Sequence, residues 1–227
     1  MDGNLLLAQM FALADPAKVP GLSRFFKTGP GQYGEGDRFL GIPVPCTRLA
    51  VKECAGRTSW RDLEECIASE YHEIRLAALL MLVHVFRHAR KDAALQKRCV
   101  DFYLEHLERV NNWDLVDLSC YELLGSWLLD KEDRSILYDL ARNGRSIWEK
   151  RVGIVSTMAF VRGRELDDTI AIAAILLPHP HDLIHKAVGW LLREVGKRDE
   201  ARLRAFLAAN ESRMSRTTYR YATELLK

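Results

Sequence analysis

The sequence contains few cysteines, and their spacing indicates neither a redox pair nor a disulfide framework. The five cysteines, an odd number, form no C-x-x-C motif. Four of them fall within helical patterns, where a free cysteine behaves as a small hydrophobic residue. We therefore expect reduced thiols and a cytoplasmic protein. The cysteines are Cys46, Cys54, Cys66, Cys99 and Cys120.

Long apolar runs are also missing. No run approaches the roughly 18–20 residues that a membrane-spanning helix needs. Near the N-terminus, Leu5-Leu6-Leu7 is not preceded by a basic segment, so it indicates an amphipathic helix rather than a signal peptide. We expect no membrane partner.

No segment shows a convincing strand pattern, and almost the whole chain has helical periodicity. Residues 28–36 are rich in glycine and are expected to form a loop. The helices expected from periodicity and capping residues span 2–14, 20–27, 45–55, 59–69, 70–89, 93–110, 113–129, 132–142, 146–162, 166–176, 182–196, 200–209 and 215–226.

The spacing of these helices predicts the architecture. Short linkers make successive helices antiparallel neighbours, and helix pairs recur about every 35–40 residues, as in HEAT-like repeats. We predict an all-α, monomeric protein with a HEAT-like or ARM-like helical-repeat solenoid and a concave basic groove. Its single domain would span 1–227, with N-terminal helices and the glycine-rich loop in 1–44 and stacked helix pairs in 45–227.

Charge is unevenly distributed along the chain. Of the 33 Lys and Arg, 16 lie in residues 142–227, which hold only 10 of the 31 Asp and Glu. A basic C-terminal portion suggests a polyanionic partner. Solvated helix faces with uneven charge are the alternative.

The segment Asn-Asn-Trp-Asp-Leu-Val-Asp at 111–117 is the most informative stretch of the chain. Its asparagines can cap a helix, and Trp113 and Asp117 then leave the same helical face one turn apart. An indole beside a carboxylate is a poor core pair. The two side chains together could instead stabilise a developing cation.

Two later segments combine aromatic and basic residues. Arg151 follows Lys150 and lies in an otherwise apolar stripe, so it needs a counter-ion. It could form a structural ion pair with a residue such as Asp117, or bind a phosphate. Trp190 lies off the apolar face of its helix and shares a turn with Lys186 and Arg193. Contact with a sugar or base, or packing against the next helix pair, would explain it.

Two other features predict no additional chemistry. His181 and His185 have the spacing of metal ligands, but no nearby Cys or carboxylate completes a set, and Pro180 starting a helix explains the segment. The glycine-rich loop lacks the Lys-Ser/Thr ending of a P-loop. We therefore expect no metal and no cofactor.

Three segments, taken in order, resemble the AlkD-like DNA alkylation repair family. They are Trp113-x-x-x-Asp117, Trp148-Glu149-Lys150-Arg151 and the segment Lys-Ala-Val-Gly-Trp-Leu-Leu-Arg-Glu at 186–194. The segment Tyr-Gly-Glu-Gly-Asp-Arg-Phe-Leu-Gly at 33–41 also resembles an N-terminal element of that family. The resemblance covers nearly the whole chain.

The resemblance implies a HEAT-like DNA glycosylase that removes cationic N3- and N7-alkylpurines from duplex DNA. It implies that Asp117 is the catalytic carboxylate, that Trp113 and Trp190 line the deoxyribose, and that Arg151 holds the DNA backbone. Lys150, Lys186 and Arg193 are further expected DNA contacts. No motif places a lysine for a Schiff base, so we expect no lyase step. The alternative is a catalytically inactive helical-repeat protein that binds DNA or a protein partner.

Overall fold

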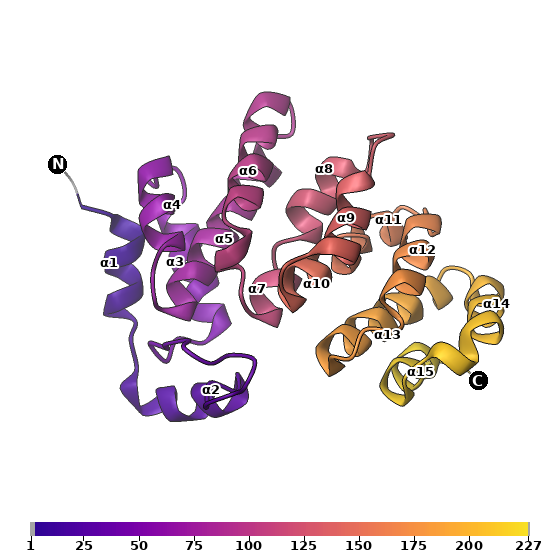
Figure 1. The fold of residues 1–227 in the computed structure, drawn as a ribbon. Helices are drawn as coiled ribbons and strands as arrows, with labels where there is room; N and C mark the ends of the chain where they lie inside the picture. The colour runs from indigo at the N-terminus through magenta and orange to yellow at the C-terminus, as the bar shows by residue number, and fades with distance from the viewer. Residues whose placement is uncertain (1–2, 227) are drawn as a thin grey trace. The chain divides into compact units, whose positions relative to one another are not determined.

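The computed structural model describes residues 3–226, and within that range the chain is helical (Figure 1). The range contains no β-strand. The described residues do contain an isolated β-bridge, which joins Arg38 and Tyr71. The all-α prediction is confirmed. No helix within 3–226 is long and apolar enough to cross a membrane.

The chain divides into two compact units, 1–115 and 116–227, and the boundary falls inside helix α7. The expected single solenoid domain and its concave groove stay predictions.

Unit 1 is built around α5, a helix that is buried on every side over much of its length. Its residues from Ile74 to Val83 are all buried, and α5 packs against α3, α4 and α6. The helices of this unit are α1 (Leu5–Ala12), α2 (Val19–Phe25), α3 (Val44–Cys54), α4 (Trp60–Ile67), α5 (His72–His88), α6 (Ala93–Glu105) and the start of α7 (Trp113–Asp117).

Unit 2 has its core between α10 and α13. Helix α10 packs against α9 and α13, and α13 packs against α12, α14 and α15. The helices that follow α7 are α8 (Ser126–Leu128), α9 (Ser135–Asn143), α10 (Ile147–Val155), α11 (Met158–Arg162), α12 (Asp167–Leu176), α13 (Asp182–Gly196), α14 (Glu200–Asn210) and α15 (Arg216–Thr223). A π-helical turn, Tyr121–Gly125, lies between α7 and α8 in the chain.

Side-chain caps explain where many helices begin. Ser59 and Asp62 form a reciprocal capping box at α4, which begins close to the start predicted for helix 59–69. Asn4, Asp92 and Ser146 cap α1, α6 and α10 by accepting backbone N–H groups. The first helix is shorter than the predicted 2–14, and residue 2 lies outside the described residues.

Two long helices expected from periodicity, 113–129 and 146–162, are interrupted. The π-helical turn breaks the first, and the second divides into α10 and α11 at Ser156 and Thr157. The Thr157 hydroxyl donates to the Ile154 carbonyl at 2.7 Å, a local bond that competes with continued helix. The two breaks meet, because a Cβ on Gly125 would lie only 2.1 Å from the Ser156 carbonyl oxygen. Close backbone approach therefore replaces regular helix at this point.

Candidate functional site

Helix α7 begins at Trp113, whose side chain is half-buried in unit 1. The Asn112 side-chain oxygen accepts the Trp113 N–H at 2.9 Å, so this asparagine does bond the start of the helix. The indole lies nearly parallel to the Phe26 ring, with centroids 5.5 Å apart and an angle of 18°. Phe25 meets it edge-on at 5.9 Å. Aromatic contacts therefore hold the Trp113 ring while part of it remains accessible.

Asp117, the last residue of α7, lies in unit 2 and forms a two-pronged ion pair with Arg151 of α10. Arg151 Nε donates to one carboxylate oxygen at 2.8 Å, and an Nη donates to the other at 2.7 Å. The second Nη donates to the Leu183 carbonyl at the start of α13. The exposed fractions of the Arg151 and Asp117 side chains are 7% and 16%. The structure thus contains the ion pair that was one alternative for Arg151, and the phosphate contact stays a prediction.

The other predicted DNA-binding cations also have partners within the protein. Lys150 donates to the Arg142 carbonyl at 2.7 Å, at the C-terminal end of α9. Lys186 pairs with Asp182 one turn earlier on α13, at 2.8 Å, and Arg193 pairs with Glu224. Ion pairs this exposed contribute about 0–1 kcal/mol each, so a phosphate could displace the carboxylate partners at little cost.

Trp190 lies on α13 and is half-buried, so part of the indole is accessible. Its neighbour Gly189 is buried against α15. A Cβ there would lie 2.5 Å from the Tyr221 Cβ and 2.7 Å from the Thr218 carbonyl oxygen. The glycine of this motif therefore has a packing role: it lets α15 approach the helix that carries Trp190.

The histidines at and before the start of α13 form local backbone contacts. His181 caps the helix by accepting the Leu183 N–H at 3.2 Å, and His185 contacts the His179 carbonyl. Burial lowers the pKa values of His179 and His181. Within residues 3–226, no three His, Cys, Asp or Glu side chains are grouped so that they could hold a metal ion.

Sequence reasoning missed a buried polar cluster around Trp113 in unit 1, which we call the α7 anchor. Its members are Asp37, His72, Arg75, Asn111, Asn112 and Asp114. The His72 ring nitrogens lie 3.1 Å from an Asp37 oxygen and 2.8 Å from an Asp114 oxygen. Burial opposes the charged imidazole, but the hydrogen bonds with Asp114 and Asp37 outweigh it and raise the pKa of His72 to about 9. Polar residues at the start of the otherwise apolar α5 pattern were the available signal.

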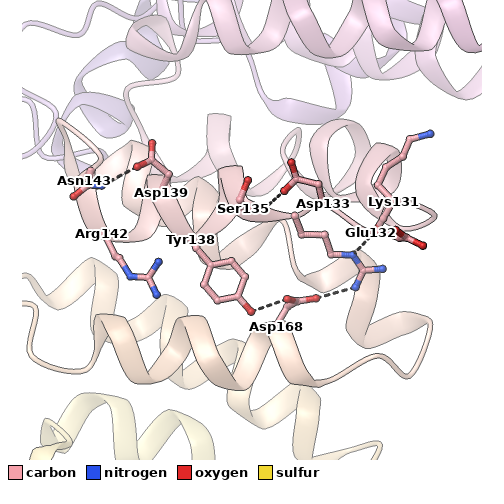
Figure 2. Close-up of a pocket in the computed structure, with 10 residues that line it drawn as sticks. Lys131, Glu132, Asp133, Ser135, Tyr138, Asp139, Arg142, Asn143 and Asp168 are labelled. Atoms are coloured by element: carbon pink, nitrogen blue, oxygen red, sulfur yellow. Dashed lines mark hydrogen bonds and ion pairs between the residues drawn. The ribbon is translucent and has the colours of Figure 1, made fainter.

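A separate pocket of about 840 Å³ opens in unit 2, and none of the predicted site residues lines it. Its polar side chains bind one another, as Figure 2 shows for Tyr138 and Asp168. The Tyr138 hydroxyl donates to Asp168 at 2.7 Å, and Arg134 pairs with the same carboxylate at 2.8 Å. The Asp168–Arg134 pair thus resembles the Asp117–Arg151 pair in chemistry but stands apart from the predicted site.

A comparison with protein families and one with solved structures agree with each other. A family model described as "DNA alkylation repair enzyme" matches residues 6–226. A solved structure titled a predicted DNA alkylation repair enzyme from Enterococcus faecalis is similar, with 17% identity, a TM-score of 0.70, and coverage of 94% of this chain and 96% of that one. The structure of smu.31 from Streptococcus mutans UA159 has 14% identity, a TM-score of 0.56, and coverage of 80% and 92%. A search of the curated proteins gives no match.

Proposed function

Because the chain belongs to the DNA alkylation repair enzyme family, we propose that it is a monofunctional DNA glycosylase that excises purines alkylated at N3 or N7 from duplex DNA. The single observation that carries this proposal is the Asp117–Arg151 pair. It presents an oriented carboxylate at a partly accessible position, within a segment that resembles a motif of the family.

The chemistry of the lesion explains why one carboxylate could suffice. Alkylation at N3 or N7 makes the purine a cation, so it leaves the sugar as a neutral base. No acid is then needed to protonate the leaving group, in contrast to ordinary glycoside hydrolysis with its two carboxyl groups. The remaining task is to stabilise the positive charge that grows on the deoxyribose, and a preorganised anion does this electrostatically.

Arg151 gives Asp117 a fixed orientation for this task. Both carboxylate oxygens accept hydrogen bonds from one planar guanidinium, which is itself held by the Leu183 carbonyl. A guanidinium has five N–H groups, so two remain beyond these three bonds for a DNA phosphate. Arg151 would therefore position Asp117 and, in the bound state, also contact the DNA backbone.

The two tryptophans support the proposal separately. Trp113 in unit 1 and Trp190 in unit 2 are each half-buried, so each retains indole surface for a ligand. The face of an indole attracts a cation by about 0.5–2 kcal/mol, depending on desolvation. This attraction would strengthen as the sugar becomes positive, which is the kind of interaction that accelerates a reaction.

The experiment measures free 7-methylguanine released from methylated duplex DNA by the wild type and by Asp117→Asn. The amide keeps the shape of the carboxylate but removes its charge, so we expect at least a hundredfold loss of release, about 2.7 kcal/mol or more of lost transition-state stabilisation. Binding to the same DNA, measured by fluorescence anisotropy, should change little.

Asp168→Asn is the matched control. Asp168 also pairs with an arginine of unit 2, and its side chain is 20% exposed, close to the 16% of Asp117. This variant should retain wild-type release, which separates loss of an ion pair from loss of the reactive carboxylate. Undiminished release by Asp117→Asn would refute the assignment. A wild type that binds DNA but releases no base would instead support the non-catalytic DNA-binding alternative.

A further inference from the structure

The residues on both sides of Trp113 are tied to the first turn of α5 and to Asp37. Asn111 accepts a hydrogen bond from Arg75 at 3.0 Å, and Asn112 donates to Asp37 at 3.2 Å. Asp114 contacts His72 at 2.8 Å. The α7 anchor thus forms hydrogen bonds with the residues before and after Trp113. All of its members lie in unit 1.

His72 is the central member of the anchor. It is the first residue of α5, is 1% exposed, and faces a carboxylate at each ring nitrogen. A neutral imidazole has one N–H, so only the protonated ring donates to both Asp37 and Asp114. Arg75, one turn further along α5, shares Asp37, so two cations and two carboxylates balance within the cluster.

The same ring is part of the aromatic packing beneath Trp113. The Phe26 ring lies 4.7 Å from the His72 ring and 5.5 Å from the indole, and Phe39 stacks on His72 at 4.8 Å. His72 is therefore connected to Trp113 through two sets of contacts. One is the hydrogen bond to Asp114, the residue that follows Trp113, and the other is the packing of both rings against Phe26.

We propose that His72 is a positioning residue, which fixes the first turn of α7 and the Trp113 indole by bridging Asp37 and Asp114. Its importance for base release rests on the proposed function. The hydrogen bond to Asp114 is the decisive contact, because Asp114 directly follows Trp113 in the helix. A buried ionic cluster is weak evidence for stability, and specifying one geometry is its better-attested use.

Two substitutions separate the two hydrogen bonds of His72. Glutamine places an amide N–H near the position of Nε2, which faces Asp114, whereas asparagine places it near Nδ1, which faces Asp37. We expect His72→Asn to lower kcat for 7-methylguanine release about ten- to a hundredfold with little change in KM. His72→Gln should retain most of the activity. Equal losses in the two variants would refute a role through Asp114.

A spectroscopic readout tests the positioning without any activity. The protein has five tryptophans, and labelling with 5-fluorotryptophan gives a fluorine resonance for each, with Trp113→Phe identifying that of Trp113. In His72→Asn this resonance should shift or broaden while the other four stay in place. In His72→Gln it should remain near its wild-type position. An unmoved Trp113 resonance in His72→Asn would overturn the proposal.

The wild type provides a second test that does not depend on a variant folding. The groups facing His72 are Asp37, Asp114 and the rings of Phe26 and Phe39. Loss of the proton leaves one N–H for two carboxylates, and the tautomer that donates to Asp37 gives up the hydrogen bond to Asp114. The Trp113 resonance should therefore move between pH 7 and 10. A resonance that is constant over this range contradicts the proposal. If the wild type releases no alkylated base, the proposed function fails, but this resonance still decides whether His72 positions the indole.

Discussion

Replacing Gly189 by alanine tests how α15 is seated on the helix that carries Trp190. Two effects oppose each other in this variant. Alanine in place of glycine inside a helix favours folding by about 1 kcal/mol. The added methyl would lie 2.5 Å from the Tyr221 Cβ and 2.7 Å from the Thr218 carbonyl oxygen, well inside the 3.5–4.0 Å at which carbon atoms make their best contact.

The steric effect should be the larger one. Overpacking of this kind costs about 1–3 kcal/mol, and the upper end applies because the obstacles are the backbone and a Cβ of α15, which cannot rotate away. Subtracting the gain in helix propensity leaves a net loss of about 2 kcal/mol in the free energy of unfolding. Helix α15 has to move away from α13 to accommodate the methyl group.

Urea unfolding of Gly189→Ala and of Gly21→Ala provides the measurement. Gly21 also lies within a helix, α2, but a Cβ there meets nothing within 4 Å, so its variant should be as stable as the wild type or up to about 1 kcal/mol more stable. Hydrogen exchange followed by mass spectrometry should place the loss of protection of Gly189→Ala in residues 216–223. A Gly189→Ala protein at least as stable as the wild type would refute the packing argument.

Three further predictions concern unit 1. The pKa of His72 is raised from 6.5 to about 9, so its contribution to the free energy of unfolding is complete below pH 6.5 and is lost as the pH rises to about 9. In urea unfolding, the wild type should therefore lose about 3 kcal/mol more stability than His72→Gln between pH 6.5 and 9.5. Glu73 accepts three consecutive backbone N–H groups, those of residues 40–42, at 2.9–3.1 Å, so Glu73→Gln should lower stability by about 2–3 kcal/mol in the same assay, and an unchanged midpoint would contradict this role. Of the five cysteines only Cys46 is exposed, so a thiol reagent should modify one cysteine rapidly, and Cys46→Ser should abolish that phase.

Local signals in the sequence were sufficient for much of the fold. Helical periodicity gave α5 and α13 nearly to their ends, and a capping residue placed the start of α4 close to Ser59. Periodicity did not reveal the breaks near Gly125 and Ser156. They arise from close contact between two backbone segments distant in the sequence, which leaves no periodic trace.

The candidate site was likewise predictable only in part from the sequence. The requirement that a guanidinium in an apolar stripe has a counter-ion led to Asp117 as a candidate partner of Arg151, and the structure contains that pair. The contacts of the α7 anchor could not be predicted, because they join His72 to Asp37, 35 positions earlier in the chain, and to Asp114, 42 positions later. Whether Asp117, Trp113 and Trp190 act on DNA stays a prediction until base release is measured.

The Glu73 contact has a consequence for dividing the protein into fragments. The segment 40–42 supplies every one of the three backbone donors that this 2% exposed carboxylate accepts. A shortened chain that began at α3 would keep Glu73 inside α5 but remove those donors, leaving an uncompensated charge in the interior. Residues 40–42 are therefore an integral part of unit 1, and an expression boundary placed after them should yield an unstable fragment.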